Sequence, residues 1–285
     1  MIFDKKIVSD FARAQSLEWL ETNGLGGYAC GTVSGAHSRR YHGLLVAATH
    51  PPVGRVQLLS KLDETIICEK VKYELGTNQY PGAVHPQGFK FLKSFKRDLF
   101  PEFYFEAGGI ELKKTIAAIH GENTTIILYE VTDAPSKFEL ELLPLYASKD
   151  FHSLAHANDY ISTQYIFDDG IFRTLNYHGC PELFIMVPQS QFTERRGWYF
   201  NFQYSQEQQR GMDSEEDLYT HGSFTVELKK GDKLSIIVST ENPLGRDPGR
   251  LFLTEKKRRA QLIKPFYDNP HLQRLSKPTH RTQHR

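Results

Sequence analysis

Apolar and polar residues alternate with a period of two along much of this 285-residue chain. The alternation is clearest at residues 137–146 (KFELELLPLY) and 109–119 (GIELKKTIAAI). Successive side chains of a β-strand point to opposite faces of a sheet, so this pattern is typical of strands with one face in a core and the other in solvent. The period predicts antiparallel sheets, because these can leave one face in water.

Several other segments are rich in the β-branched and aromatic residues that favour strands. They are residues 124–132, 183–187, 198–204, 223–228 and 233–240. The turn sequence KKGD at 229–232 predicts a hairpin between the last two segments, with Gly231 free to adopt positive φ. We therefore expect an all-β fold, a large antiparallel β-sandwich (supersandwich-like) with a short C-terminal helix.

That helix is predicted over residues 254–264, with Thr254 as N-cap and Pro265 as its end. The charge run EKKRR within it predicts a solvated face. Residues 1–275 are expected to form one domain. Residues 276–285 are basic and lack periodicity, which indicates a disordered tail.

Charge and cysteine content exclude several classes of protein. The formal net charge is +1, which favours neither nucleic acid nor an anionic membrane as a partner. No apolar run reaches the roughly 20 residues needed to cross a bilayer. Cys30, Cys68 and Cys180 form no C-x-x-C pair, so we expect reduced thiols in a cytoplasmic protein, no metal site and no cofactor.

The segment 22–48 (TNGLGGYACGTVSGAHSRRYHGLLVAA) is dense in glycine. It does not predict a nucleotide site, because its spacing differs from G-x-G-x-x-G and no helix pattern follows. Two interpretations remain open. The glycines form tight turns and a strand edge, or residues 22–42 form a glycine-supported loop that presents polar side chains for a ligand or a neighbouring domain. The side chains concerned are Asn23, Arg39, Arg40, Tyr41 and His42.

The two arginines of this segment are hard to place together in a core. A buried guanidinium requires a carboxylate partner, so we expect one arginine in an internal ion pair and the other facing outward. In an alternating strand, Arg39 and Tyr41 would share one face, and Arg40 and His42 the other. The pattern does not decide which face is exposed.

Three strings in the first third of the chain carry a family resemblance. They are EWLETNGLGGY, SRRYHGLL, and PPVGR followed by LLSKLDE. Further similar stretches follow at 95–116, at 149–152 (KDFH) and at 198–224. Over about residues 14–275 the chain resembles the opening of glycogen debranching enzymes of the amylo-α-1,6-glucosidase type. It departs from that pattern at His37-Ser38, where Asn-Thr is usual, and at Lys149, where arginine is expected.

The resemblance implies an N-terminal β-sandwich that precedes a catalytic α-helical barrel. In that family the barrel carries the acid and base carboxylates, so we expect no catalytic residue in this chain and no glucosidase activity by itself. The implied partners are an α-glucan (glycogen or a branched dextrin) and such a barrel. The remaining candidates for glucan or interface contacts are Trp198, Tyr199, Glu216 and Asp217, although adjacent carboxylates at 215–217 are also typical of a solvated loop.

Two functional hypotheses remain. The chain is an accessory domain of a debranching enzyme, supporting glucan binding and packing on the barrel. Alternatively, it is a stand-alone remnant or a protein-interaction module without glucan activity. The sequence does not distinguish a domain on its own, a shortened gene product and one half of a split enzyme.

Overall fold

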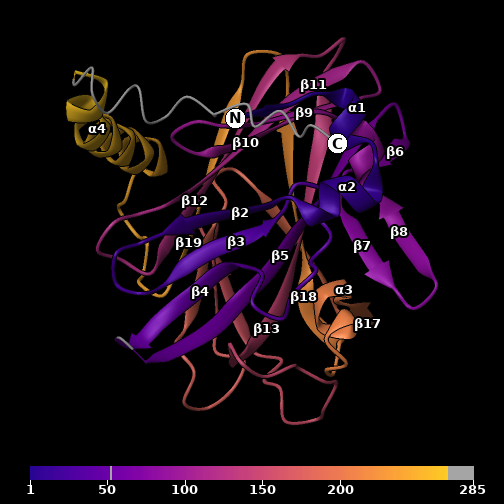
Figure 1. Cartoon of the computed structure of the whole chain (residues 1–285), viewed down its shortest axis with the longest axis vertical. Helices are drawn as coiled ribbons and strands as arrows, with labels where there is room; N and C mark the ends of the chain where they lie inside the picture. Colours follow the sequence, from indigo (N-terminus) through magenta and orange to yellow (C-terminus); the bar gives the residue numbers. More distant parts are fainter. Residues whose placement is uncertain (52, 269–285) are drawn as a thin grey trace, which may run out of the picture.

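The computed structural model describes residues 1–51 and 53–268, and it consists mainly of two large antiparallel sheets that pack as a sandwich (Figure 1). The predicted all-β sandwich is therefore confirmed. The predicted tail at 276–285, and the domain end at 275, lie outside the described residues.

The two sheets of the sandwich are called sheet A and sheet B here. Sheet A has nine strands, in the spatial order β1 (Ile2–Phe3), β9 (Leu92–Arg97), β10 (Pro101–Ala107), β11 (Ile110–Ala118), β12 (Thr124–Asp133), β19 (Lys233–Ser239), β16 (Leu183–Met186), β15 (Ile171–Thr174) and β14 (Tyr165–Asp168). Sheet B runs in the order β17 (Gln191–Gln203), β18 (Glu215–Leu228), β13 (Phe138–Asp150), β5 (Gly54–Cys68), β4 (Gly43–His50), β3 (Tyr28–Thr32) and β2 (Glu18–Thr22), with β6 (Val71–Glu74) paired to β5.

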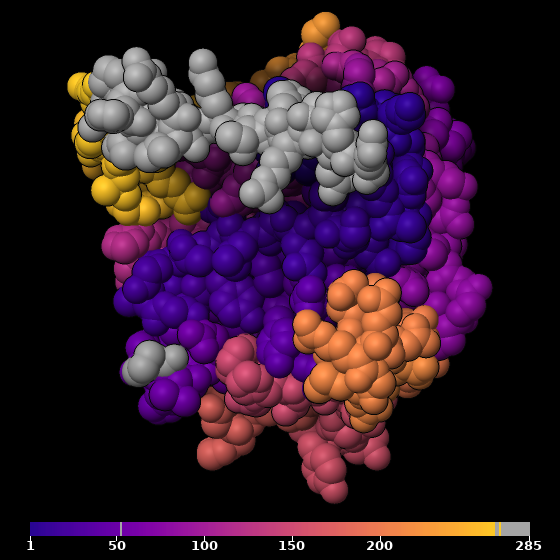
Figure 2. Space-filling view, viewed as in Figure 1, coloured from indigo at the N-terminus to yellow at the C-terminus, as the bar shows by residue number. Residues whose placement is uncertain are grey.

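The smaller elements lie around these sheets. They are a two-stranded hairpin of β7 (Thr77–Tyr80) and β8 (Ala83–Gln87), and the helices α1 (Lys5–Val8), α2 (Phe11–Ser16), η1 (Gly88–Phe91), α3 (Ser205–Gln209) and α4 (Pro248–Tyr267). Within the described ranges no helix is long and apolar enough to cross a membrane. Figure 2 shows the segment around α3 standing out from a face formed mostly by the N-terminal strands.

The period-two pattern corresponds to the side-chain alternation of the sheets. In β13, Leu140 and Leu142 are completely buried in the core between the sheets, whereas Glu139 and Glu141 face away from it. Strand β12 alternates less, because both of its faces are covered. Tyr129 lies in the main core, while Ile126 on the other face belongs to a small cluster against which Leu251 and Phe252 of α4 pack.

The C-terminal helix is confirmed, but its predicted bounds are wrong. It begins at Pro248 and continues past Pro265 to Tyr267. Asp247 caps it, accepting a hydrogen bond from the backbone N–H of Arg250 at 3.0 Å. Proline is favoured at the first helical position, because its missing N–H has no partner there anyway. Thr254, the predicted cap, instead lies inside the helix and donates its hydroxyl to the Arg250 carbonyl.

The charge run at 255–259 is only partly solvated, contrary to the prediction. Lys256 and Lys257 are exposed, but the Glu255 side chain is buried and binds Arg259 at 2.7 Å. The Arg259 guanidinium also reaches the fully buried Glu21 carboxylate of β2 at 2.6 Å and lies over the Phe100 ring. These contacts fasten the middle of α4 to the sandwich.

The predicted hairpin at 229–232 is wrong, although its turn is present. Gly231 has φ +88°, as expected, and the turn joins β18 to β19. However, β18 belongs to sheet B and β19 to sheet A, so the two strands do not pair with each other. Alternation shows that two segments are strands, but it does not show whether a short turn returns to the same sheet or crosses to the facing one.

Candidate functional site

The predicted loop at 22–42 is partly wrong, because β3 occupies residues 28–32. Residues 33–42 connect β3 to β4 as a loop, so the alternating strand considered for Arg39 to His42 is also wrong. A turn in which the His42 N–H donates to the Arg39 carbonyl, at 3.2 Å, lies there instead. The predicted grouping of the four side chains is nevertheless found. Arg40 and His42 are both buried, and Arg39 and Tyr41 are both partly exposed.

Arg40 is the arginine with the internal ion pair. Its Nε lies 3.4 Å from a carboxylate oxygen of Glu207, a side chain that is 1% exposed. Its terminal nitrogens donate to the carbonyls of His152 at 3.0 Å and Asp213 at 2.9 Å. Arg40 therefore joins the loop to α3, which carries Glu207, and to the two segments that supply the carbonyls.

Arg39 and His42 both bind Glu18 at the start of β2. The Ser38 N–H donates to Nδ1 of His42 at 3.2 Å, so the proton of the neutral ring is on Nε2, which faces Glu18 at 3.4 Å. Arg39 Nε donates to the same carboxylate at 2.7 Å. The hydrogen bond from His42, followed by that from Arg39, lowers the pKa of Glu18 to about 2. Burial lowers the pKa of His42 and keeps its ring neutral.

The sequence suggested that Glu216 lies in a solvated loop. It lies instead in strand β18 and is fully buried. It binds Lys149 of β13 at 2.6 Å and accepts a hydrogen bond from the Tyr204 hydroxyl. Lys149, the position that departs from the family pattern, also donates to the Arg40 carbonyl at 3.1 Å. We call Arg40, Glu207, Lys149 and Glu216 the buried charge cluster.

The Asp217 carboxylate also forms hydrogen bonds within the protein. It accepts backbone N–H groups from Ala157 and Asn201, each at 2.9 Å. With Glu216 paired to Lys149, these adjacent carboxylates hold local structure and are not arranged as an exposed acid–base pair. Neither Glu207 nor Tyr204 was identified from sequence, since each is brought to the cluster by the path of the chain around α3.

Asn23 is buried in the turn between β2 and β3. Its amide nitrogen donates to the Glu122 carbonyl at 2.8 Å, and its amide oxygen accepts from the Leu25 N–H at 2.9 Å. A Cβ at Gly27 would lie 2.6 Å from that same nitrogen, so only glycine fits there. Asn23 thus fastens the glycine turn to the loop before β12.

The exposed side of the loop forms a small surface with neighbouring aromatic and basic residues. The Tyr41 hydroxyl lies 3.3 Å from Nδ1 of His152, and its ring packs against Phe151. The Arg55 guanidinium lies over the Phe151 ring, 5.1 Å from its centroid. We call Arg39, Tyr41, Arg55, Phe151 and His152 the arginine–aromatic surface.

Trp198 and Tyr199 lie next to each other on β17 but face in opposite directions. Trp198 packs edge-on against Tyr219 beside the main core, with ring centroids 5.2 Å apart. Tyr199 borders a groove of about 270 Å³ between sheet B and the β7–β8 hairpin, which we call the hairpin groove. The groove is lined by Asp63, Glu64, Thr65, Lys72, Glu74, Gly76, Asn78, Tyr80, His85, Pro86, Glu141, Leu143, Arg195 and Tyr199.

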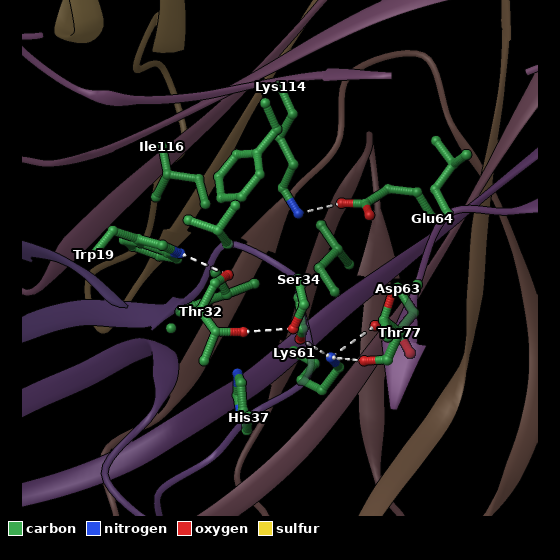
Figure 3. Close-up of a pocket in the computed structure, with 18 of the residues that line it drawn as sticks. Trp19, Thr32, Ser34, His37, Lys61, Asp63, Glu64, Thr77, Lys114 and Ile116 are labelled. Atoms are coloured by element: carbon green, nitrogen blue, oxygen red, sulfur yellow. Dashed lines mark hydrogen bonds and ion pairs between the residues drawn. The ribbon is translucent and has the colours of Figure 1, made fainter. Parts of the chain in front are cut away.

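A second, smaller cavity lies between the sheets (Figure 3). Its volume is about 60 Å³, and it has a polar side with His37 and Lys61 and an apolar side with Trp19 and Ile116. Such a volume has room for water but not for a ligand of the size of a sugar chain. Across residues 1–51 and 53–268, no group of three or more His, Cys, Asp or Glu side chains is placed to hold a metal.

Comparisons with solved structures give two distant similarities. A bacterial glucoamylase in complex with acarbose aligns with 92% of this chain and 36% of its own, at 8% identity and a TM-score of 0.41. A polysaccharide lyase aligns with 84% of this chain and 34% of its own, at 13% identity and a TM-score of 0.30. This chain thus spans about a third of the length of either structure.

The search of curated proteins finds no match. The comparison with protein families does find one, described as glycogen debranching enzyme N terminal, over residues 17–235. That match includes the glycine-rich turns, the loop at 33–42, the hairpin groove and the buried charge cluster. The chain therefore belongs to the family of glycogen debranching enzyme N-terminal domains.

Proposed function

We propose that this chain is the accessory domain of a cytoplasmic glycogen-debranching glucosidase, and that it packs on a catalytic helical barrel and helps to hold a branched α-glucan. The family match over residues 17–235 is the observation that carries the proposal. The three cysteines are all unpaired, which agrees with a reducing compartment.

The second half of α4 supports a contact with another domain. Beyond Arg259, residues 260–265 are exposed, and the Leu262 side chain retains 66% of its accessible surface. Figure 1 shows α4 to one side of the two sheets. Ile263, at 37%, adds a further exposed apolar side chain next to Leu262. Exposed apolar side chains on one element are typical of a surface that another protein surface covers.

The arginine–aromatic surface is the second place where a barrel or its substrate would contact this domain. Arg39 and Tyr41 are partly exposed, and arginine and tyrosine are enriched in interfaces. The buried partners of the same loop, Arg40 and His42, hold that surface in position. Because they are the partly exposed residues of this loop, Arg39 and Tyr41 are our candidates for the outward contact that the sequence left open.

The test of barrel packing uses the full chain and a separately expressed barrel from a debranching enzyme. We expect the two to co-elute in size-exclusion chromatography, and Leu262→Asp to weaken their association at least tenfold, because a buried charge would replace an apolar contact. Ile166→Asp is the control, since Ile166 is equally apolar and 59% exposed on β14. No association with the parent chain would contradict the packing proposal.

The test of the glucan role is co-sedimentation with glycogen, together with glucose release from a limit dextrin. We expect the chain to sediment with glycogen and to release no glucose by itself, because Glu216 and Asp217 are engaged in the fold. A stand-alone remnant or an interaction module would remain in the supernatant. Steady glucose release abolished by Glu216→Gln would refute the assignment of catalysis to the barrel.

A further inference from the structure

The hairpin groove lies on the face of sheet B that points away from the core. In the register of β5 and β13, Asp63 pairs with Leu143 and Thr65 pairs with Glu141. These side chains are partly exposed, whereas Leu142 between them is completely buried. The floor of the groove is therefore built from two long, well-supported strands.

The β7–β8 hairpin forms the opposite wall and is held close to this floor. Asn78 donates its amide N–H to Asp63 at 2.7 Å. A Cβ at Gly76 would lie 2.7 Å from Cγ of Asp63, so a side chain there would force the hairpin outward. Strand β7 also lies against β17, which carries Tyr199 (Figure 1). The groove is thus shaped in advance, which lowers the entropic cost of binding.

Four of the charged side chains that line the groove have no partner in the described part of the chain. Among the described residues, none of Lys72, Glu74, Glu141 and Arg195 makes an ion pair or a side-chain hydrogen bond. The adjacent Arg196, by contrast, binds Glu194 at 3.0 Å. Groups with unused hydrogen-bonding capacity on a concave surface are available to a ligand.

A second groove, of about 390 Å³, lies beside α4. There Lys113 binds both Glu102 at 2.9 Å and Glu130 at 3.1 Å. Lys233 also binds Glu130, at 2.7 Å. These charges neutralise one another, but Lys96, Asp98 and Lys256 also line that groove and make no ion pair among the described residues. The hairpin groove differs from it in having tyrosines in its lining.

Two tyrosines complete the hairpin groove. Tyr80 and Tyr199 are each partly buried against the cluster around Leu218. Burial, with Asp63 and Tyr199 nearby, raises the pKa of Tyr80, so its hydroxyl remains a donor at neutral pH. Neither hydroxyl is hydrogen-bonded to another side chain in the described part of the protein. The groove thus combines aromatic faces with both donors and acceptors.

We propose that the hairpin groove is a carbohydrate site that binds the end of an α-glucan chain. The inference rests on the proposed function, which supplies the substrate class, and it specifies where on this domain the glucan lies. Sugar hydroxyls donate and accept hydrogen bonds at once, so they satisfy Glu141 and Arg195 together, while the apolar faces of the rings pack on Tyr80 and Tyr199.

The charge of the groove gives an anionic ligand no advantage. Four carboxylates line it, but Glu64 pairs with Lys114 and Asp63 lies 3.5 Å from Lys61, which leaves Glu74 and Glu141 against Lys72 and Arg195. The groove therefore has no net positive charge to attract a phosphate or nucleic acid, and a neutral saccharide does not need one. Binding of a saccharide is then only weakly dependent on salt, because no counterions need to be released.

The experiment measures maltoheptaose binding to the full chain by calorimetry, with cellohexaose as the β-linked comparison. We expect Arg195→Ala and Tyr199→Ala each to weaken maltoheptaose binding about tenfold, the effect of losing a charged hydrogen bond or a ring contact. Glu141→Gln keeps the size of the side chain and tests the acceptor if either variant unfolds. Arg196→Ala is the matched control and should bind within twofold of the parent.

The possible outcomes separate this proposal from the proposed function. If the parent binds maltoheptaose and the groove variants bind it equally well, the glucan site lies elsewhere and only this inference fails. If the parent binds no maltoheptaose but Arg195→Ala weakens association with the barrel, the groove is a domain interface. Preference for a lysine-rich peptide, lost in high salt, would also overturn the carbohydrate assignment.

Discussion

The buried charge cluster and the hairpin groove contain similar types of charged residue, but these residues are paired in the cluster, whereas four of those in the groove are unpaired among the described residues. Both border the small apolar cluster around Leu218, to which Tyr204 contributes on one side and Tyr199 on the other. In the buried cluster Arg40 has Glu207, and Lys149 has Glu216. In the groove, Arg195 and Glu141 have no such partners within the part of the chain that the structure describes. Burial makes pairing obligatory, whereas partial exposure lets a charge remain available to a ligand.

The largest expected effect comes from breaking a pair in the buried cluster. Arg40→Met should lower the free energy of unfolding by about 3–5 kcal/mol, because Glu207 would be left as a buried charge with no counterion. Urea denaturation followed by fluorescence measures this change. The groove variant Arg195→Ala provides the comparison and should unfold close to the parent. A loss below about 1 kcal/mol in Arg40→Met would show that Glu207 is compensated in another way.

Acid should destabilise the protein through its buried histidines. Burial holds the pKa of His37 well below its usual 6.5, so below pH 6.5 the unfolded chain binds a proton that the folded chain does not. Stability therefore falls as pH decreases, by up to about 2 kcal/mol for this histidine between pH 7 and pH 5. His37→Gln should have a correspondingly flatter pH dependence in urea denaturation.

The matched control for that prediction is His85, which lines the groove and is exposed. His85→Gln should keep the pH dependence of the parent, because the ring is exposed and folding does not bury it. Equal slopes for His37→Gln and the parent would mean that acid acts through other groups, such as His221, whose pKa burial lowers to about 4.

The smallest expected effect concerns Arg39, the neighbour of Arg40. Its pair with Glu18 is partly exposed, with 27% and 38% of the two side chains accessible. Arg39→Ala should therefore change the free energy of unfolding by less than about 1 kcal/mol. Its effect should appear instead as weaker association with a separately expressed barrel. A melting temperature lowered as much as in Arg40→Met would remove the distinction between the two arginines.

Many of the strands were predictable because the alternation of apolar and polar residues is a local property of the sequence. The alternation around Leu140 and Leu142 depends only on which residues are apolar, and it placed β13 correctly. The start of α4 was missed because Asp247 and Pro248 stand before a stretch without strong helical periodicity. The burial of Glu216 was also missed, because a carboxylate between two other acidic residues is typical of a solvated turn. Its lysine partner, Lys149, is distant in the sequence.

By itself, the sequence determined the all-β class, the family, the turn at Gly231 and the need for one of two adjacent arginines to have a carboxylate partner. These follow from interactions within a few residues, or from the cost of burying a charge. Only the tertiary structure decided that Arg40 is that arginine, that the turn at 229–232 crosses between sheets, and that Tyr199 borders a groove with Asp63 and Glu141. Such choices depend on contacts between residues far apart in the sequence, such as Arg40 and Glu207, which no local pattern encodes.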